Sequence, residues 1–138
     1  MTSAATVPGE ALARAIALLE ERFRPVAILL YGSHASGRAA AESDIDLGIV
    51  VGRDTIDPFS VASAKTELEA VLGRPVDLAV LDGASPILRM EALRNHRILS
   101  RRDPEAYERF VVRTLGDYFD LKKVREPIEK ALLSGPPS

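Results

Sequence analysis

Residues 26–51 read VAILLYGSHASGRAAAESDIDLGIVV, and this stretch decides the fold. Its first six residues form a continuous apolar run between Pro25 and Gly32, which predicts a short strand buried on both faces. A turn rich in Gly, Ser and Ala follows, and residues 45–51 then predict a second strand that is closed by Gly52. The stretch therefore predicts two strands joined by a turn of small residues.

The flanking elements follow from periodicity and from helix-capping signals. Apolar residues at spacings of four, three and four predict a helix over residues 10–24. Asp or Ser followed by proline is a common helix start, and it predicts helices that begin at Pro58, Pro86 and Pro104. The other predicted features are a third strand over residues 76–81, a short extended piece over 97–100, and a kink or interruption at Pro127. This order predicts an α/β sandwich with helices mainly on one face of the sheet.

Length and composition bound the class of protein. The 138 residues are enough for one ordinary domain, expected over residues 1–138, with 46% hydrophobic and 28% charged residues. The formal net charge of -2 disfavours stable nucleic-acid binding. Because the chain has no Cys, no leader-like start and no apolar run of membrane-spanning length, we expect a cytoplasmic protein without a membrane segment.

Three aspartates are expected to meet on one face of the sheet. Side chains alternate along a strand, so Asp44 and Asp46 share a face opposite the apolar residues between and after them. On the third strand, Val76, Leu78 and Val80 form the core set and leave Asp77 on the opposite face. Like charges about 4 Å apart repel by roughly 4 kcal/mol at an effective dielectric near 20, so the cluster favours a bound hard cation, Mg²⁺ or Mn²⁺.

The small-residue turn suits the phosphates that such a cation binds. Gly32 lets the backbone approach a phosphate, and the Ser33 hydroxyl is a donor, so a nucleoside triphosphate is the expected second ligand. Arg38-Ala39 stands where a P-loop requires Lys and Ser or Thr, which excludes that motif. Gly48 and Ala79 either leave room for the nucleotide on the carboxylate face or merely reflect strand composition.

The order Gly32-Ser33, ten residues, then Asp44-x-Asp46 resembles the signature of the DNA polymerase beta-type nucleotidyltransferase superfamily. The resemblance covers residues 26–81, the expected catalytic core, and the small size is similar to the minimal nucleotidyltransferase branch of antitoxins. It implies a nucleotidyltransferase fold: a small mixed sheet with an active-site cleft on one face and C-terminal helices over about residues 85–133. It also implies Mg²⁺-dependent transfer of AMP from ATP to a tyrosine of a partner HEPN-type toxin.

The resemblance also implies a role for each site residue. Gly32 and Ser33 would hold the triphosphate, Asp44 and Asp46 would bind two Mg²⁺ ions, and Asp77 would bind the catalytic ion and help deprotonate the nucleophile. Relatives often carry Arg just before the second glycine of the turn. This chain has Ser36 there, and Arg38 is expected to supply the phosphate contact instead.

Two other functions stay open at this point. One is a small-molecule nucleotidyltransferase of the aminoglycoside-modifying kind, although few residues follow the third strand to build an acceptor domain. The other is a non-catalytic antitoxin that neutralises its partner by binding alone. The arginines of the last third, Arg102 among them, form either a solvated face or a docking surface. The aromatic residues of the last helix belong either to the core or to the same docking surface.

Overall fold

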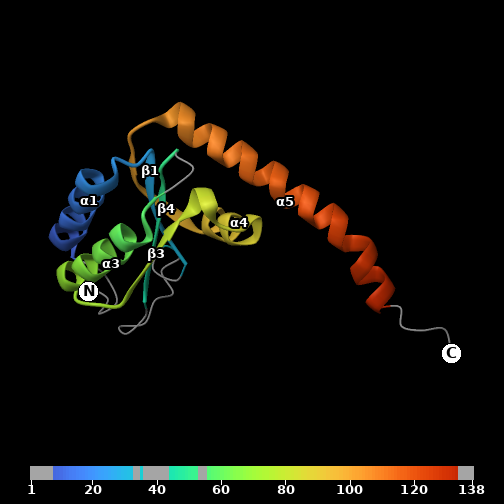
Figure 1. Cartoon of the computed structure of the whole chain (residues 1–138), viewed down its shortest axis with the longest axis horizontal. Coiled ribbons are helices and arrows are strands. Elements are labelled where there is room, and N and C mark those ends of the chain that lie inside the picture. The colour runs from blue at the N-terminus through green and yellow to red at the C-terminus, as the bar shows by residue number, and fades with distance from the viewer. Residues whose placement is uncertain (1–7, 33–34, 36–43, 53–55, 134–138) are drawn as a thin grey trace.

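The computed structural model describes residues 8–32, 35, 44–52 and 56–133. Its elements, in chain order, are α1 (Gly9–Phe23), β1 (Ala27–Tyr31), β2 (Ile45–Val50), α3 (Pro58–Leu72), β3 (Val76–Val80), the 3-10 turn η1 (Leu81–Gly83), α4 (Pro86–Arg94), β4 (His96–Arg101) and α5 (Pro104–Leu133). Figure 1 shows helices on both sides of a central sheet. The predicted α/β order is confirmed, and no helix among the described residues is long and apolar enough to span a membrane.

The four strands form one mixed sheet in the order β3-β2-β1-β4. β1 pairs antiparallel with both β2 and β4, whereas β2 and β3 run parallel. The extended piece predicted over residues 97–100 is thus a full edge strand, which returns the chain to the sheet after α4. The predicted small mixed sheet is confirmed, and β2 lies in its interior between β1 and β3.

Local sequence signals position the helices. The side chain of Asp57 accepts a hydrogen bond from the Phe59 amide at the start of α3, and Ser85 accepts one from the Leu88 amide at the start of α4. In both helices proline occupies the first turn, where its missing N–H is not needed. Both caps lie at the predicted positions, so the predicted starts of α3 and α4 are confirmed.

One face of the sheet is covered by α1 and α3. Leu19 of α1, Leu68 of α3 and Leu47 of β2 are fully buried there. The cluster also contains Ile28, Leu30, Ile45, Ile49, Val76 and Leu78 from alternating strand positions. Alternation therefore directs the paired aspartates of β2 and β3 to the opposite face.

The opposite face is partly covered by α4 and the first turns of α5. Leu29 and Tyr31 of β1 pack there with Ala92 of α4 and with Tyr107 and Phe110 of α5. This second core also includes Val50 of β2 and Leu81 of η1, whereas Asp77 on β3 is exposed and Asp46 on β2 is half-buried. The C-terminal helices thus leave the part of this face that carries Asp46 and Asp77 accessible.

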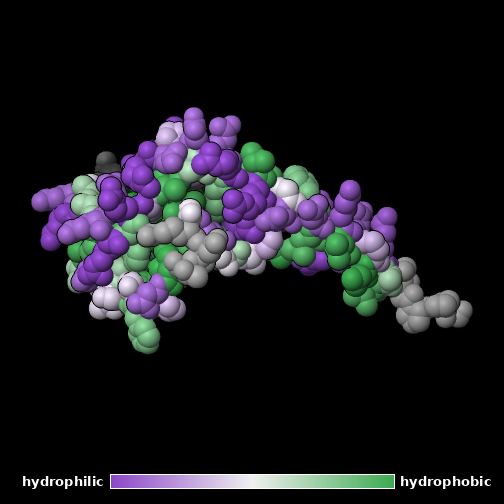
Figure 2. All heavy atoms as spheres, turned by 45° about the horizontal axis from the view of Figure 1, so that its top comes forward, coloured by the Kyte–Doolittle hydropathy of each residue, from purple (hydrophilic) through white to green (hydrophobic). Residues whose placement is uncertain are grey.

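The last helix extends away from the domain. Figure 1 shows α5 running beyond the sheet, and every residue from Lys122 to Leu133 is exposed. Figure 2 shows apolar side chains gathered on this overhang, where Val124 is 66%, Ile128 57% and Leu132 76% exposed. The aromatic residues of α5 therefore divide, with Tyr107 and Phe110 in the core and Phe119 outside it.

Pro127 does not interrupt α5, so of the predicted kink or interruption the interruption is wrong. The helix continues through Pro127 to Leu133. A helical proline removes one N–H bond and crowds the preceding turn. The exposed position lets water satisfy the carbonyl that loses its partner, so the overhang tolerates the residue.

The overhang should contribute little to stability. Of the described residues, a chain that ends at Glu126 loses exposed side chains only, and with them the Arg125–Glu129 surface ion pair. We expect its thermal unfolding midpoint to lie within about 2 °C of the full chain. In contrast, Phe110→Ala removes a buried side chain from the same helix and should lower the midpoint by several degrees. A drop of more than about 5 °C on truncation would show that the overhang packs against the domain.

Candidate active site

Two aspartates and a tyrosine lie side by side across three strands. Asp46 on β2 is the register partner of Asp77 on parallel β3 and of Tyr31 on antiparallel β1. Register partners project to the same face, and neighbouring strands lie about 4.8 Å apart. Asp46 is half-buried, Asp77 is exposed, and Tyr31 is buried. The sequence prediction that Asp46 and Asp77 share one face is confirmed by this register.

The pKa of Tyr31 reflects its burial and three nearby carboxylates. Burial, followed by the charges of Asp77, Asp46 and Glu91, raises the pKa of Tyr31 to about 12. Each of these effects disfavours the phenolate. The phenol of Tyr31 is therefore protonated at neutral pH and lies in the field of three carboxylates, two from the sheet and one from α4.

Gly32 follows Tyr31 and lies against the Asp46 carboxylate. Its φ of +73° is in the left-handed region. A Cβ built on Gly32 would lie 2.5 Å from Oδ2 of Asp46, so the carboxylate occupies the space where a side chain would be. Glycine is required here both by the backbone conformation and by this close approach. In the structure the group that approaches Gly32 is the Asp46 carboxylate. The contact of the Gly32 backbone with a phosphate stays a prediction.

The other predicted site residues are placed less fully. Asp44 is exposed and directly precedes β2, two residues before Asp46. Ser33 and Arg38 lie outside the described residues. Over the described ranges, no group of three or more Asp, Glu, His or Cys side chains is arranged to hold a metal ion.

The donor chemistry of the site nevertheless suits magnesium. Asp46 and Asp77 supply only carboxylate oxygens, and Mg²⁺ typically takes one or two protein carboxylates and completes its shell with water and substrate phosphates. A cation between the two strands would also offset the repulsion of the paired charges. The pair formed by Asp46 and Asp77 therefore fits the ion, with Asp44 at the entry to the strand.

The space beside Gly48 is filled by protein. A Cβ on Gly48 would lie 2.7 Å from Cδ1 of Leu81 and 3.3 Å from Cε1 of Tyr31. Leu81 is fully buried in the second core. Two interpretations of the small residues Gly48 and Ala79 were open, and the one that leaves room for a nucleotide does not hold at Gly48, whose small size lets Leu81 pack on the sheet.

A buried arginine fixes α4, which carries Glu91, against α5. The Arg89 guanidinium is almost fully buried and lies 3.1 Å from the Asp117 carboxylate. Its Nε donates to the Ala84 carbonyl at 3.1 Å. These contacts hold the helix that brings Glu91 towards Tyr31.

Tyr31 and Glu91 were not predicted as part of the site. Tyr31 ends a continuous apolar run, where alternation does not reveal which face a residue occupies. Only the register with Asp46 identifies its face. Glu91 reaches the site through packing of α4, which no local signal encodes.

Comparisons with known proteins agree with this geometry. The family model described as polymerase beta, nucleotidyltransferase, matches residues 14–105. The chain is 30% identical over 103 residues to the protein adenylyltransferase MntA of Shewanella oneidensis, which covers 73% of this chain and 71% of that protein.

Two solved structures superpose on this chain over most of its length. A chain of a crystal structure described as the toxin–antitoxin with AMP-PNP superposes with a TM-score of 0.79 at 27% identity, covering 88% of this chain and 98% of that one. A chain of the tri-AMPylated Shewanella oneidensis HEPN toxin in complex with MNT antitoxin superposes with a TM-score of 0.74 at 25% identity, covering 90% and 97%.

Proposed function

The chain belongs to the polymerase beta nucleotidyltransferase family, and from that premise we propose that it is a protein adenylyltransferase of a toxin–antitoxin pair. It transfers AMP from ATP to a hydroxyl group, expected to be a tyrosine, of a partner HEPN toxin and thereby acts as the antitoxin. The observation that carries this proposal is the pairing of Asp46 with Asp77 beside Gly32, in a chain similar to MntA over most of its length.

The site residues divide the work of the reaction. The hydroxyl oxygen of the toxin forms a bond to the α-phosphorus of ATP, the bond from that phosphorus to the bridging oxygen breaks, and pyrophosphate leaves. In the proposal, Asp77 takes the proton from the attacking hydroxyl, because its exposed carboxylate lies beside Asp46 on the accessible part of the face. Gly32, Ser33 and Arg38 bind the triphosphate and hold the α-phosphate in line with the nucleophile.

Asp44, Asp46 and Asp77 would hold the magnesium, two ions in the proposal. When bound, magnesium would neutralise charge on the phosphates and on the leaving pyrophosphate. The contribution of the chain is to fix this set of oxygens on β2 and β3, so that little reorganisation is needed when charge moves.

The remaining parts of the proposal concern the whole chain. We place residues 1–138 in one nucleotidyltransferase unit, with a catalytic core over 26–81 and a C-terminal helical part over 85–133. The family match over residues 14–105 supports the core. The reaction needs ATP, which fits a cytoplasmic location, and the net charge of -2 supports a protein acceptor rather than stable binding of nucleic acid.

Label transfer from ATP tests the proposed reaction. The chain is incubated with Mg²⁺ and the HEPN toxin co-expressed with it, using ATP labelled either at the α- or at the γ-phosphorus. We expect the toxin to take up only the α label, because AMP retains that phosphorus and pyrophosphate carries away the other two.

Two results would contradict the proposal. Uptake of the γ label by the toxin would indicate phosphate transfer instead. Labelling of an aminoglycoside with no labelling of the toxin would favour the small-molecule nucleotidyltransferase.

A further inference from the structure

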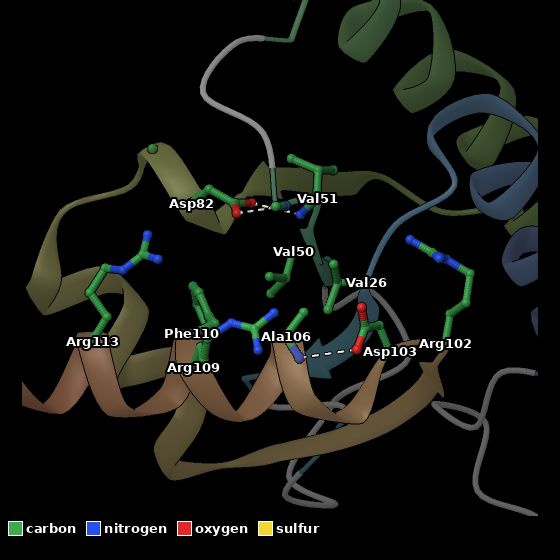
Figure 3. A pocket seen from close by; sticks show the side chains of 12 residues that line it. Val26, Val50, Val51, Asp82, Arg102, Asp103, Ala106, Arg109, Phe110 and Arg113 are labelled. Carbon is green, nitrogen blue, oxygen red and sulfur yellow. Dashed lines mark hydrogen bonds between the residues drawn. The ribbon is translucent and has the colours of Figure 1, made fainter.

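A second cavity lies at the other end of the sheet from Asp46. It has a volume of about 500 Å³ and is bounded by the end of β2, by η1 and by the first turns of α5 (Figure 3). Val50, which lines it, pairs with Ala27 at the start of β1, whereas Asp46 pairs with Tyr31 at the end of that strand. The cavity is therefore separate from the candidate active site.

Three charged residues of the cavity already have partners within the protein. Both carboxylate oxygens of Asp82 accept backbone hydrogen bonds, from the Val51 amide at 2.7 Å and the Gly52 amide at 2.9 Å. Asp103 accepts one from the Ala106 amide at 3.1 Å. Arg102 donates to the Pro25 and Arg24 carbonyls at 3.1 and 3.0 Å. These hydrogen bonds hold the three side chains in place at the edge of the cavity.

Arg109 and Arg113 are the two charged lining residues that have no such partner. In the described part of the chain neither side chain makes a hydrogen bond or an ion pair, and Glu105, one turn before Arg109, is beyond ion-pair distance. Both side chains rise from α5 on the side that faces β2 and η1 (Figure 3). Like charges four residues apart on a helix repel weakly, and an anion bound between the two guanidinium groups would offset this repulsion.

The chemistry of the lining indicates which anion fits. Two guanidinium groups offer forked donors that match phosphate oxygens. Val26, Val50 and Phe110 provide an apolar wall beside them. The volume lies within the range of small-molecule sites, about 300 to 1,000 Å³. We propose that this cavity binds a phosphate-bearing small molecule through Arg109 and Arg113, at a site distinct from that of the transferred nucleotide.

Calorimetric titration tests this second site directly. The titrations use the full chain with Asp46→Asn and Asp77→Asn and without Mg²⁺, so that the candidate active site contributes little. AMP and inorganic pyrophosphate are the two probes. We expect one bound ligand per chain, and Arg109→Gln with Arg113→Gln should weaken its binding by at least about tenfold.

Matched variants distinguish binding at this cavity from a general effect of the protein's charge. Arg14→Gln with Lys65→Gln removes the same two charges from exposed positions on α1 and α3, on the opposite face, and should leave the affinity within about twofold. Arg109→Lys with Arg113→Lys keeps the charge but not the fork and should give an intermediate loss. Because all these side chains are exposed, the unfolding midpoints should be unchanged, which shows that the variants fold.

The outcomes are distinct. Tighter binding of AMP than of pyrophosphate would support the site and identify a nucleotide as its ligand. Equal affinities for AMP and pyrophosphate would also support the site and would show that it recognises the phosphate groups alone. The proposal would be overturned if neither probe bound at millimolar concentration, if the Arg109→Gln, Arg113→Gln variant bound as well as its parent, or if the Arg14→Gln, Lys65→Gln control lost as much affinity.

Discussion

Replacing Asp46 with asparagine should lower the rate of AMP transfer by at least about a thousandfold. The change keeps the shape of the side chain but removes the charge that lies between Asp77 and Tyr31 and against Gly32. Removing one of two adjacent like charges also relieves repulsion, so the free energy of unfolding should not fall greatly. The rate is measured as α-label uptake by the toxin in single-turnover reactions with saturating ATP.

Asp120→Asn is the matched control for this prediction. It makes the same chemical change at an exposed position on α5, distant from the paired strands, and should leave the rate within about twofold. If Asp46→Asn transferred AMP at a rate close to that of the unchanged chain, Asp46 would not belong to the catalytic set and the proposed site would be wrong.

Gly32→Ala should lower the transfer rate by about a hundredfold or more, because the new methyl group would occupy the position of the Asp46 carboxylate. The built Cβ lies 2.5 Å from Oδ2 of Asp46, so the carboxylate must move. A displacement of about 1 Å in a catalytic group costs on the order of a hundredfold in rate. The left-handed backbone at Gly32 adds a destabilisation of about 1 to 2 kcal/mol. Both effects are measured, the first by label transfer and the second by urea unfolding.

Gly73→Ala separates these two effects. Gly73 ends α3 with a φ of +69°, close to that of Gly32, but a Cβ there would meet nothing within 4 Å. We therefore expect a similar loss of stability, about 1 to 2 kcal/mol, with the transfer rate nearly unchanged. Equal loss of activity in both variants would mean that backbone strain, not the contact with Asp46, explains the effect at Gly32.

The sequence alone predicts the parts of this fold that depend on local signals. The caps at Asp57 and Ser85 set where α3 and α4 begin, and alternation along β2 and β3 determines the faces of Asp46 and Asp77. Periodicity likewise predicted α1 and its buried stripe. In each case the decisive residues lie within one or two turns, or within one strand, of each other.

Features that depend on packing between distant segments were not predictable. Tyr31 joins the site only through its register with β2. The space beside Gly48 is filled by Leu81 of η1, which follows β3. β4 completes the sheet as a full strand, although its residues show no strong alternation. The helix α5 continues through Pro127 because this part of it is exposed to solvent, which the sequence pattern does not reveal.

The intact mass of the partner toxin tests the central claim most directly. The toxin is co-expressed with the unchanged chain or with the Asp44→Asn, Asp46→Asn variant, purified, and incubated with ATP and Mg²⁺ before mass spectrometry. We expect a gain of one or more AMP units, roughly 329 Da each, only with the unchanged chain. An unmodified toxin that still forms a tight complex with the chain would contradict AMP transfer and indicate neutralisation by binding alone.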